Sequence, residues 1–283
     1  MRIPRPIARW LLGWLMMTAT VAVGAQPQRP LNAVAPEEIP AAAANAVTFT
    51  PPDWNTVPDT PLGDMIRIGR DVFVDTQRYA KPYVGNKLNC VNCHLDGGRL
   101  ANSAPLWAAY VAYPAFRSKN NQVNTFEQRL EGCFRFSMNG KMPPADSLVV
   151  VSLVSYAFWL ATGAPVGAQL AGRGFPAVPQ PALTPSVTRG ADVYQAHCAA
   201  CHQADGAGLR ADGKYTFPPV WGRDSYNKGA GMHRMHTAAA FIKANMPLGQ
   251  GGTLTDQQAW DVAAYIDSKP RPPDPRTRTR APK

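Results

Sequence analysis

Two segments, CVNCH at residues 90–94 and CAACH at residues 198–202, determine how the rest of this 283-residue chain is interpreted. Each has two cysteines separated by two residues and followed directly by histidine. Two thiols one helical turn apart can each bond a vinyl group of haem, and the next imidazole can then reach the iron. The sequence therefore predicts two covalent haem c groups. The predicted attachment residues are Cys90, Cys93, Cys198 and Cys201, and the predicted proximal iron ligands are His94 and His202.

Other sites built on paired cysteines fit the sequence less well. A structural zinc site needs further cysteine or histidine pairs at matched spacing, and the three remaining histidines do not supply them to both segments. A redox dithiol of the thioredoxin kind needs a strand–helix–strand setting, whereas strand signals are scarce in this chain. Haem attachment is therefore the favoured interpretation.

The two segments lie in stretches that look like diverged copies of one unit. Each stretch opens with a short helical pattern, IGRDVF at 68–73 and RGADVY at 189–194, and has a Met-Pro step after its cysteines. Each closes with a predicted helix behind a capping residue. These helices are 148–161, led by Asp146 or Ser147, and 256–268, led by Thr255. We expect a mainly α protein with two class I cytochrome c-like domains joined by a Pro-rich linker.

The N-terminus has the pattern of a secretory signal peptide. Arg2, Arg5 and Arg9 precede an apolar run at 10–23, and small residues predict cleavage near Ala25. The run of about 14 residues is shorter than the ~20 that span a bilayer, so we expect an exported, periplasmic protein. The predicted parts are a signal peptide at 1–25, an N-terminal extension at 26–61, a first domain at 62–163, a linker at 164–186, a second domain at 187–268 and a disordered tail at 269–283.

The composition limits the kinds of partner that the chain can have. Hydrophobic residues make up 45%, which is enough for a packed core, and the formal net charge is +10. The basic residues are spread along the chain without a long run, so nucleic-acid binding is not expected. An anionic substrate or an acidic protein partner fits this charge better.

Cys133 is the one cysteine that the two haem segments leave over. Three roles are open for it: a buried inert residue, a bond to another chain, or a thiolate ligand at the sixth position of the first haem. It lies 39 residues after His94, a separation typical of the loop that brings a distal ligand to the iron. Met142 competes for the same position, because a thioether is the usual ligand for electron transfer.

The sixth ligand of the second haem is expected to be Met246, which corresponds to Met142 in the internal repeat. Several residues in the same stretch carry side chains that can also bind iron. These rivals are His233, His236, Lys243, Met232 and Met235. A core or solvated role is the ordinary one for each of them.

One block of sequence resembles a known family. Cys133-Phe134 followed by SMNG at 137–140, between two haem segments, is similar to the dihaem thiosulfate dehydrogenases, the periplasmic cytochromes c that form tetrathionate. The segments at 231–234 and 241–247 resemble the second domain of that family, and the resemblance extends over about residues 62–268. The cysteine block is its specific part, because many cytochromes carry two haem segments.

The resemblance implies an oxidoreductase that joins two thiosulfate ions into tetrathionate and releases two electrons; some family members run the reverse reaction. It implies a catalytic first haem with His94 and Cys133 as ligands, and a second haem with His202 and Met246 that passes electrons out. The implied acceptor is a small cytochrome c or a high-potential iron–sulfur protein, soluble or membrane-attached. Relatives with lysine directly before this methionine exchange ligands on reduction, whereas Asn245 stands there in this chain.

Two thiosulfate dianions repel each other, so their site must be strongly positive. Arginine offers a planar fork of donors that suits sulfonate oxygens. The predicted catalytic residues are Cys133, Arg99, Arg129, Arg135 and Ser137, with Asn139 as a further neutral donor and Arg117 and Lys119 as weaker candidates. The other roles open to each arginine are a contact with a haem propionate and a plain surface charge.

Three other functions remain alternatives at this point. The first is a plain dihaem electron carrier, with Met142 and Met246 as ligands and the arginines forming a docking face for an acidic partner. The second is a dihaem peroxidase, which needs an open or His-ligated site and a nearby acid–base group that nothing in the sequence marks. The third is a cytochrome that transfers thiosulfate onto a carrier protein's cysteine, which dependence on that partner would distinguish.

Overall fold

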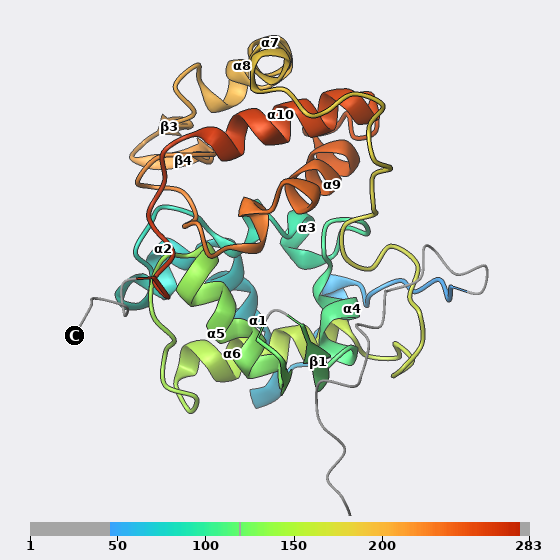
Figure 1. Cartoon of the computed structure of the whole chain (residues 1–283). Coiled ribbons are helices and arrows are strands. Elements are labelled where there is room, and N and C mark those ends of the chain that lie inside the picture. Colours follow the sequence, from blue (N-terminus) through green and yellow to red (C-terminus); the bar gives the residue numbers. More distant parts are fainter. Residues whose placement is uncertain (1–45, 119, 278–283) are drawn as a thin grey trace, which may run out of the picture. The chain divides into compact units, whose positions relative to one another are not determined.

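A computed structural model describes residues 46–118 and 120–277 of the chain. The predicted signal peptide and most of the predicted N-terminal extension lie outside the described residues. The described part is mainly helical, as predicted, and its strands form only two short antiparallel hairpins (Figure 1). These hairpins pair β1 (Ala115–Arg117) with β2 (Gln122–Asn124) and β3 (Leu209–Ala211) with β4 (Lys214–Phe217).

A first apolar core forms where α1 (Pro61–Val74) packs against α6 (Leu148–Leu160). Ser147 caps α6 by accepting a hydrogen bond from the backbone of the first turn, which confirms one of the two predicted caps. The helices cross closely at Gly69, where a Cβ atom would lie 2.0 Å from the carbonyl oxygen of Ser152. Only glycine therefore fits at this crossing.

The second core repeats this construction. α7 (Val187–His197) packs against α10 (Asp256–Ser268), and a Cβ atom on Gly190 would lie 2.0 Å from the carbonyl oxygen of Asp261. Thr255 caps α10 in a capping box with Gln258, as predicted. The two glycines occupy matching places in the IGRDVF and RGADVY patterns, so the internal repeat seen in the sequence is also a repeat of helix packing.

The remaining helices are short and surround the two paired-cysteine segments. The short helices are α2 (Thr76–Tyr79), α3 (Leu95–Gly98), α4 (Leu106–Val111), α5 (Phe126–Gly132), α8 (Ala199–His202) and α9 (Met235–Asn245). The longest of them, α9, packs against α10. The chain also forms 3-10 turns at Trp54–Thr56, Lys81–Tyr83, Cys90–Asn92 and Gly231–His233 and a π turn at Cys133–Ser137.

No helix within residues 46–118 and 120–277 is long and apolar enough to cross a membrane. The most apolar one, α6, has 13 residues. Its Val150, Leu153 and Leu160 are almost fully buried in the protein. The predicted helix at 148–161 is therefore a core helix.

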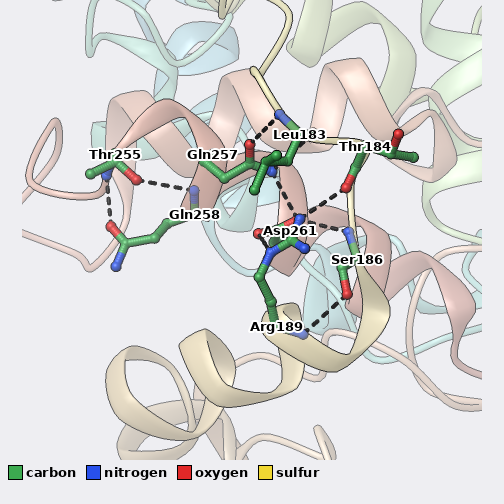
Figure 2. A network of polar contacts seen from close by, with 8 residues as sticks. All are labelled: Leu183, Thr184, Ser186, Arg189, Thr255, Gln257, Gln258 and Asp261. Atoms are coloured by element: carbon green, nitrogen blue, oxygen red, sulfur yellow. Dashed lines mark hydrogen bonds and ion pairs between the residues drawn. The ribbon is translucent and has the colours of Figure 1, made fainter.

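The predicted linker is tied to α10 through one buried carboxylate, shown in Figure 2. Asp261 accepts hydrogen bonds from Arg189 Nε and Nη2, both at 2.8 Å, and from the Ser186 backbone at 2.7 Å. Gln257 donates to the same carboxylate at 3.1 Å and also bonds the backbone of Leu183. This network fixes the end of the linker against the second helix pair.

The Asp261 network predicts a loss of stability in acid. Burial alone raises the pKa of Asp261, but the hydrogen bonds from Arg189, Ser186 and Gln257 outweigh it and hold that pKa below its usual 3.8. The carboxylate therefore stabilises the fold fully above about pH 3.8, and this contribution is lost as the pH falls through the lower folded-state value. We expect Asp261→Asn to lower the melting temperature at pH 7 by roughly 5 °C. Below pH 4, the melting temperature of this variant should fall less steeply with pH than that of wild type.

Thermal unfolding followed by circular dichroism between pH 3 and pH 7 tests this expectation. Asp192→Asn is the matched control, because Asp192 lies on the exposed side of α7. An Asp261→Asn variant that melts like wild type across this range would show that the network does not stabilise the helix pair.

The segment after α10 packs against the loop at residues 222–229. Gly222 N donates to Pro270 O at 2.8 Å and Lys228 N donates to Pro272 O at 3.0 Å, while Arg271 between them is buried. The expected disordered tail therefore does not begin at residue 269, because a buried arginine and backbone hydrogen bonds hold residues 269–277. Residues 278–283 lie outside the described part.

Buried amide side chains join stretches that the sequence assigns to different domains. Asn86 Nδ2 donates to Ser137 O at 2.8 Å and to Ser225 O at 3.2 Å. Asn227 Nδ2 donates to the side chain of Asn139 at 3.0 Å. Both amide donors are almost completely buried, so these contacts are shielded from water.

Candidate functional site

The first paired-cysteine segment lines a cavity of about 270 Å³. Cys90 begins a 3-10 turn behind Asn89, and its sulfur accepts a hydrogen bond from Thr76 Oγ1 at 3.3 Å. Burial raises the pKa of Cys90 and of Cys93 to about 12, so both side chains are neutral thiols. Neutral thiols beside an apolar cavity suit addition to vinyl groups better than the thiolate set of a structural zinc site.

His94 lies in the same cavity with its ring orientation fixed. Its Nδ1 donates to the carbonyl oxygen of Ala104 at 2.7 Å, which leaves Nε2 as the ring nitrogen free to bind a metal. Burial lowers the pKa of His94 to about 4, so the imidazole is neutral at physiological pH. A neutral ring held by a carbonyl is the arrangement expected of a proximal iron ligand.

Cys133 also lines this cavity. α5 ends at Gly132, and the chain continues in the π turn Cys133–Ser137, which brings Cys133 and Ser137 into the same lining as His94. Such turns are frequent at functional sites because they re-aim side chains within a helix. Met142 does not line the cavity and packs instead on the first core.

Arg129 is the direct partner of the Cys133 sulfur. It lies on α5 one turn before Cys133, and its Nη1 donates to Sγ at 2.8 Å. The interaction with Cys133 is the main cause that raises the pKa of Arg129 above its ordinary value, so the guanidinium stays charged. A guanidinium at this distance stabilises negative charge on sulfur or on a bound anion.

Tyr113 connects Arg129 to a second arginine. It lines the cavity, accepts a hydrogen bond from Arg117 Nη1 and also interacts with Arg129. The sequence offers Arg117 only as a weaker candidate and gives no motif that marks Tyr113. The β1–β2 hairpin brings both toward α5, which short-range sequence patterns do not reveal.

Not all of the predicted substrate residues lie at the cavity. Arg99 Nη1 donates to Pro52 O at 2.6 Å and the side chain lies near Asp96, so it holds the chain before α1. Arg135 lies over the ring of Phe136 and does not line the cavity. Arg173 of the linker does line it, and the sequence analysis missed this residue because linkers carry no periodic signal.

The second paired-cysteine segment lines a cavity of about 320 Å³. His202 Nδ1 donates to Pro218 O at 2.8 Å, and burial lowers the pKa of His202. Burial also raises the pKa of Cys198 to about 11. Met246 follows α9 and lines the same cavity. The second segment thus repeats the first, with a thioether in place of the Cys133 thiol.

Most rivals of Met246 lie away from the second cavity. Lys243 contacts Asp256 at 3.3 Å, His233 faces Asp267 at 3.4 Å, and His236 and Met235 are exposed. Met232 is the one rival that also lines the cavity. Asn245 is buried and donates to Asn102 O at 3.1 Å, so it does not face the cavity.

The two cavities share part of their walls. Leu88 and Cys93 line both of them, and Val91, Asn92 and Leu95 of the first segment line the second cavity. A group attached at Cys93 therefore lies directly against the wall of the second cavity. This juxtaposition is what transfer between two bound redox groups requires.

Both cavities fit haem by the chemistry of their donors. Each presents two cysteine thiols, one imidazole with a lowered pKa and a free Nε2, and a mostly apolar lining. Among the described residues, no group of three or more His, Cys, Asp or Glu is placed to hold a bare metal ion. Buried donors without partners, Arg271 Nε and Nη1 and Ser225 Oγ, are of the kind that haem carboxylates bind.

Comparison with known proteins agrees with this geometry. Residues 185–266 match the family model described as cytochrome c oxidase, cbb3-type, subunit III. The thiosulfate dehydrogenase of Thiomonas intermedia is 50% identical over 274 residues, which are 96% of this chain and 86% of that protein. The chain belongs to the thiosulfate dehydrogenase family. As a cytochrome c-type member of that family, it carries covalently bound haem c.

Two further relatives support the same family. The thiosulfate dehydrogenase of Stutzerimonas stutzeri is 56% identical over 228 residues, which are 81% of this chain and 74% of that protein. The solved structure of the thiosulfate dehydrogenase TsdBA from Marichromatium purpuratum superimposes with a TM-score of 0.78 at 50% identity. It matches 83% of this chain, and this chain spans 54% of the length of that one. The predicted cytochrome c-like fold is therefore confirmed.

Proposed function

We propose that this chain oxidises two thiosulfate ions to tetrathionate at the first cavity and passes two electrons through the second cavity to an external acceptor. The observation that carries the proposal is the Cys133–Arg129 pair in the cavity of His94. An electron carrier has no need for a thiol hydrogen-bonded to a charged arginine beside its proximal histidine. The names of the relatives support the same reaction.

Two haem c groups are proposed, one in each cavity. Cys90 and Cys93 would hold the first, and His94 and Cys133 would bind its iron. Cys198 and Cys201 would hold the second, and His202 and Met246 would bind its iron. Haem iron, when bound, accepts electrons one at a time. The different sulfur ligands suit different tasks, because a thiolate lowers the reduction potential of iron and a thioether raises it.

The residues around Cys133 would bind and orient the substrate. Arg129 offers donors to sulfonate oxygens, and Ser137 adds a neutral hydroxyl. Arg117 is joined to the same site through the Tyr113 hydroxyl and would supply positive charge for the second dianion. The apolar remainder of the lining excludes water, which strengthens each of these interactions. Arg99 and Arg135 are not part of this proposal.

The proposed reaction balances without oxygen or proton transfer. Two S₂O₃²⁻ ions give one S₄O₆²⁻ ion and two electrons: one sulfur–sulfur bond forms between the terminal sulfurs, and no other bond breaks. The site must therefore hold two anions with their terminal sulfurs together against their repulsion. Positive charges at fixed positions can hold the two anions together, because these charges need no rearrangement during the reaction.

Electrons would leave through the wall that the cavities share at Leu88 and Cys93. The proposed acceptor is a small cytochrome c or a high-potential iron–sulfur protein, soluble or membrane-attached. We further propose that the mature protein is periplasmic, with its signal peptide removed near Ala25, and that residues 62–163 and 187–268 are its two cytochrome c domains joined by residues 164–186.

Anaerobic addition of thiosulfate to the oxidised holoprotein tests the function. The proposal predicts reduction of both haems by thiosulfate alone. With ferricyanide present, it predicts one tetrathionate formed for two ferricyanide reduced. Haems that stay oxidised in thiosulfate, while dithionite reduces them, would instead support the non-catalytic dihaem electron carrier.

A further inference from the structure

A buried group of charged side chains lies beside the second cavity, and Arg271, named above for its unpaired donors, is one of its members. It consists of Asp267 at the end of α10, Arg271 after that helix and His233 before α9. The side chain of Arg271 is 0% exposed and that of Asp267 is 11% exposed. Asp267 Oδ1 lies 3.4 Å from His233 Nδ1 and 3.9 Å from Arg271 Nη2.

These charges are poorly neutralised within the protein. Neither carboxylate oxygen of Asp267 has a hydrogen bond of normal geometry, and the same holds for Nε and Nη1 of Arg271. Arg271 makes one hydrogen bond, to Ile266 O at 2.7 Å, and its guanidinium lies 4.2 Å from the centre of the Tyr226 ring. The charges of the group are paired only at 3.4 and 3.9 Å, and burial leaves their fields on the cavity weakly screened by water.

The group forms the layer directly behind the wall of the second cavity. Tyr226 lines the cavity and lies under Arg271. Ile266, the chain neighbour of Asp267, and Met232, the chain neighbour of His233, line it as well. Each member of the group is therefore one residue from the space that the second haem would occupy.

We propose that Asp267 and Arg271 are positioning residues that set the reduction potential of the second haem with opposite signs. Reduction adds one negative charge to the haem. The Asp267 carboxylate disfavours that charge and lowers the potential, whereas the Arg271 guanidinium favours it and raises the potential. The inference rests on the proposed function only in requiring a haem in the second cavity with Met246 as an iron ligand.

Spectropotentiometric titration of the holoprotein at pH 8, without thiosulfate, tests this inference. The methionine–iron band of the oxidised second haem reports its midpoint. We expect Asp267→Asn to favour reduction about tenfold and Arg271→Gln to disfavour it about tenfold, which is 59 mV in each direction for one electron. In the double variant, the equilibrium constant for reduction of the second haem is expected to lie within about twofold of wild type, because both charges are removed.

Matched controls separate charge from packing. Arg223, whose side chain is 94% exposed, and Asp212 in the β3–β4 turn carry the same charges in solvent. Arg223→Gln and Asp212→Asn should each change the equilibrium less than twofold. Arg271→Lys keeps the charge and is expected to keep the potential, so it decides the role of Arg271 if the glutamine variant does not fold.

The results that overturn the inference are specific. Shifts of Asp267→Asn and Arg271→Gln in the same direction, or shifts no larger than those of the exposed controls, would show that the group acts only through packing. The haem-to-protein ratio, measured as pyridine haemochrome, tests the proposed function separately. One haem per protein would exclude a second haem and with it this inference. A chain that carries two haems but does not oxidise thiosulfate would contradict the proposed function and would still allow this titration.

Discussion

Cys133→Met is expected to lower the rate of tetrathionate formation at least about 10³-fold while both haems stay attached. The attachment residues Cys90 and Cys93 do not depend on Cys133, so the haem-to-protein ratio should remain that of wild type. Methionine keeps a sulfur at the position but replaces the thiol that accepts the 2.8 Å hydrogen bond from Arg129 by a thioether that cannot become anionic. The measurement is anaerobic ferricyanide reduction by thiosulfate, with tetrathionate determined as product.

Met142→Leu is the matched control for Cys133. Met142 packs on the first core without lining the cavity, so its variant should turn over thiosulfate within about twofold of wild type. A Cys133→Met protein with full activity would show that Cys133 is not needed for catalysis. A Met142→Leu protein without activity would show that Met142 is needed instead or as well.

Arg129→Gln is expected to reduce kcat/KM for thiosulfate by about 10²–10³. The side chain supplies both the donor to Cys133 and positive charge for the substrate, and glutamine keeps a donor without the charge. Arg129→Lys restores the charge but not the planar fork, so it should recover part of the loss. Steady-state kinetics over a range of thiosulfate concentrations measure both variants.

Arg99→Gln is the control for arginine loss near the first haem segment. Its guanidinium bonds the carbonyl oxygens of Pro51 and Pro52, so we expect a change in melting temperature rather than in kcat/KM. Equal losses of kcat/KM in the Arg99 and Arg129 variants would contradict the assignment of Arg129 as the substrate arginine.

The sequence predicts the parts of this fold that depend on short-range patterns. The spacing of Cys90, Cys93 and His94 is a local chemical rule, and it identifies the haem segment without tertiary information. Capping by Ser147 and Thr255 is also local, because each bonds the first turn of its own helix. One glycine in each helix pair, Gly69 or Gly190, permits the close crossing, and both lie in the repeated pattern that the sequence shows.

The sequence does not predict features that depend on where a side chain points after folding. Arg99 and Arg129 look equally suitable in the sequence, yet one bonds the chain before α1 and the other bonds Cys133. Arg117 reaches Tyr113 from the β1–β2 hairpin, and Asp267 meets His233 from a distant helix. Such pairings are set by packing between elements, and no periodic pattern records them.

Electron paramagnetic resonance of the oxidised holoprotein tests the central claim most directly, because the low-spin ferric signal reports the axial ligands of each haem. The account predicts one signal typical of histidine–thiolate ligation, which disappears in Cys133→Met and persists in Met142→Leu. A wild-type spectrum with only histidine–methionine signals, or a thiolate signal that survives in Cys133→Met, would contradict it.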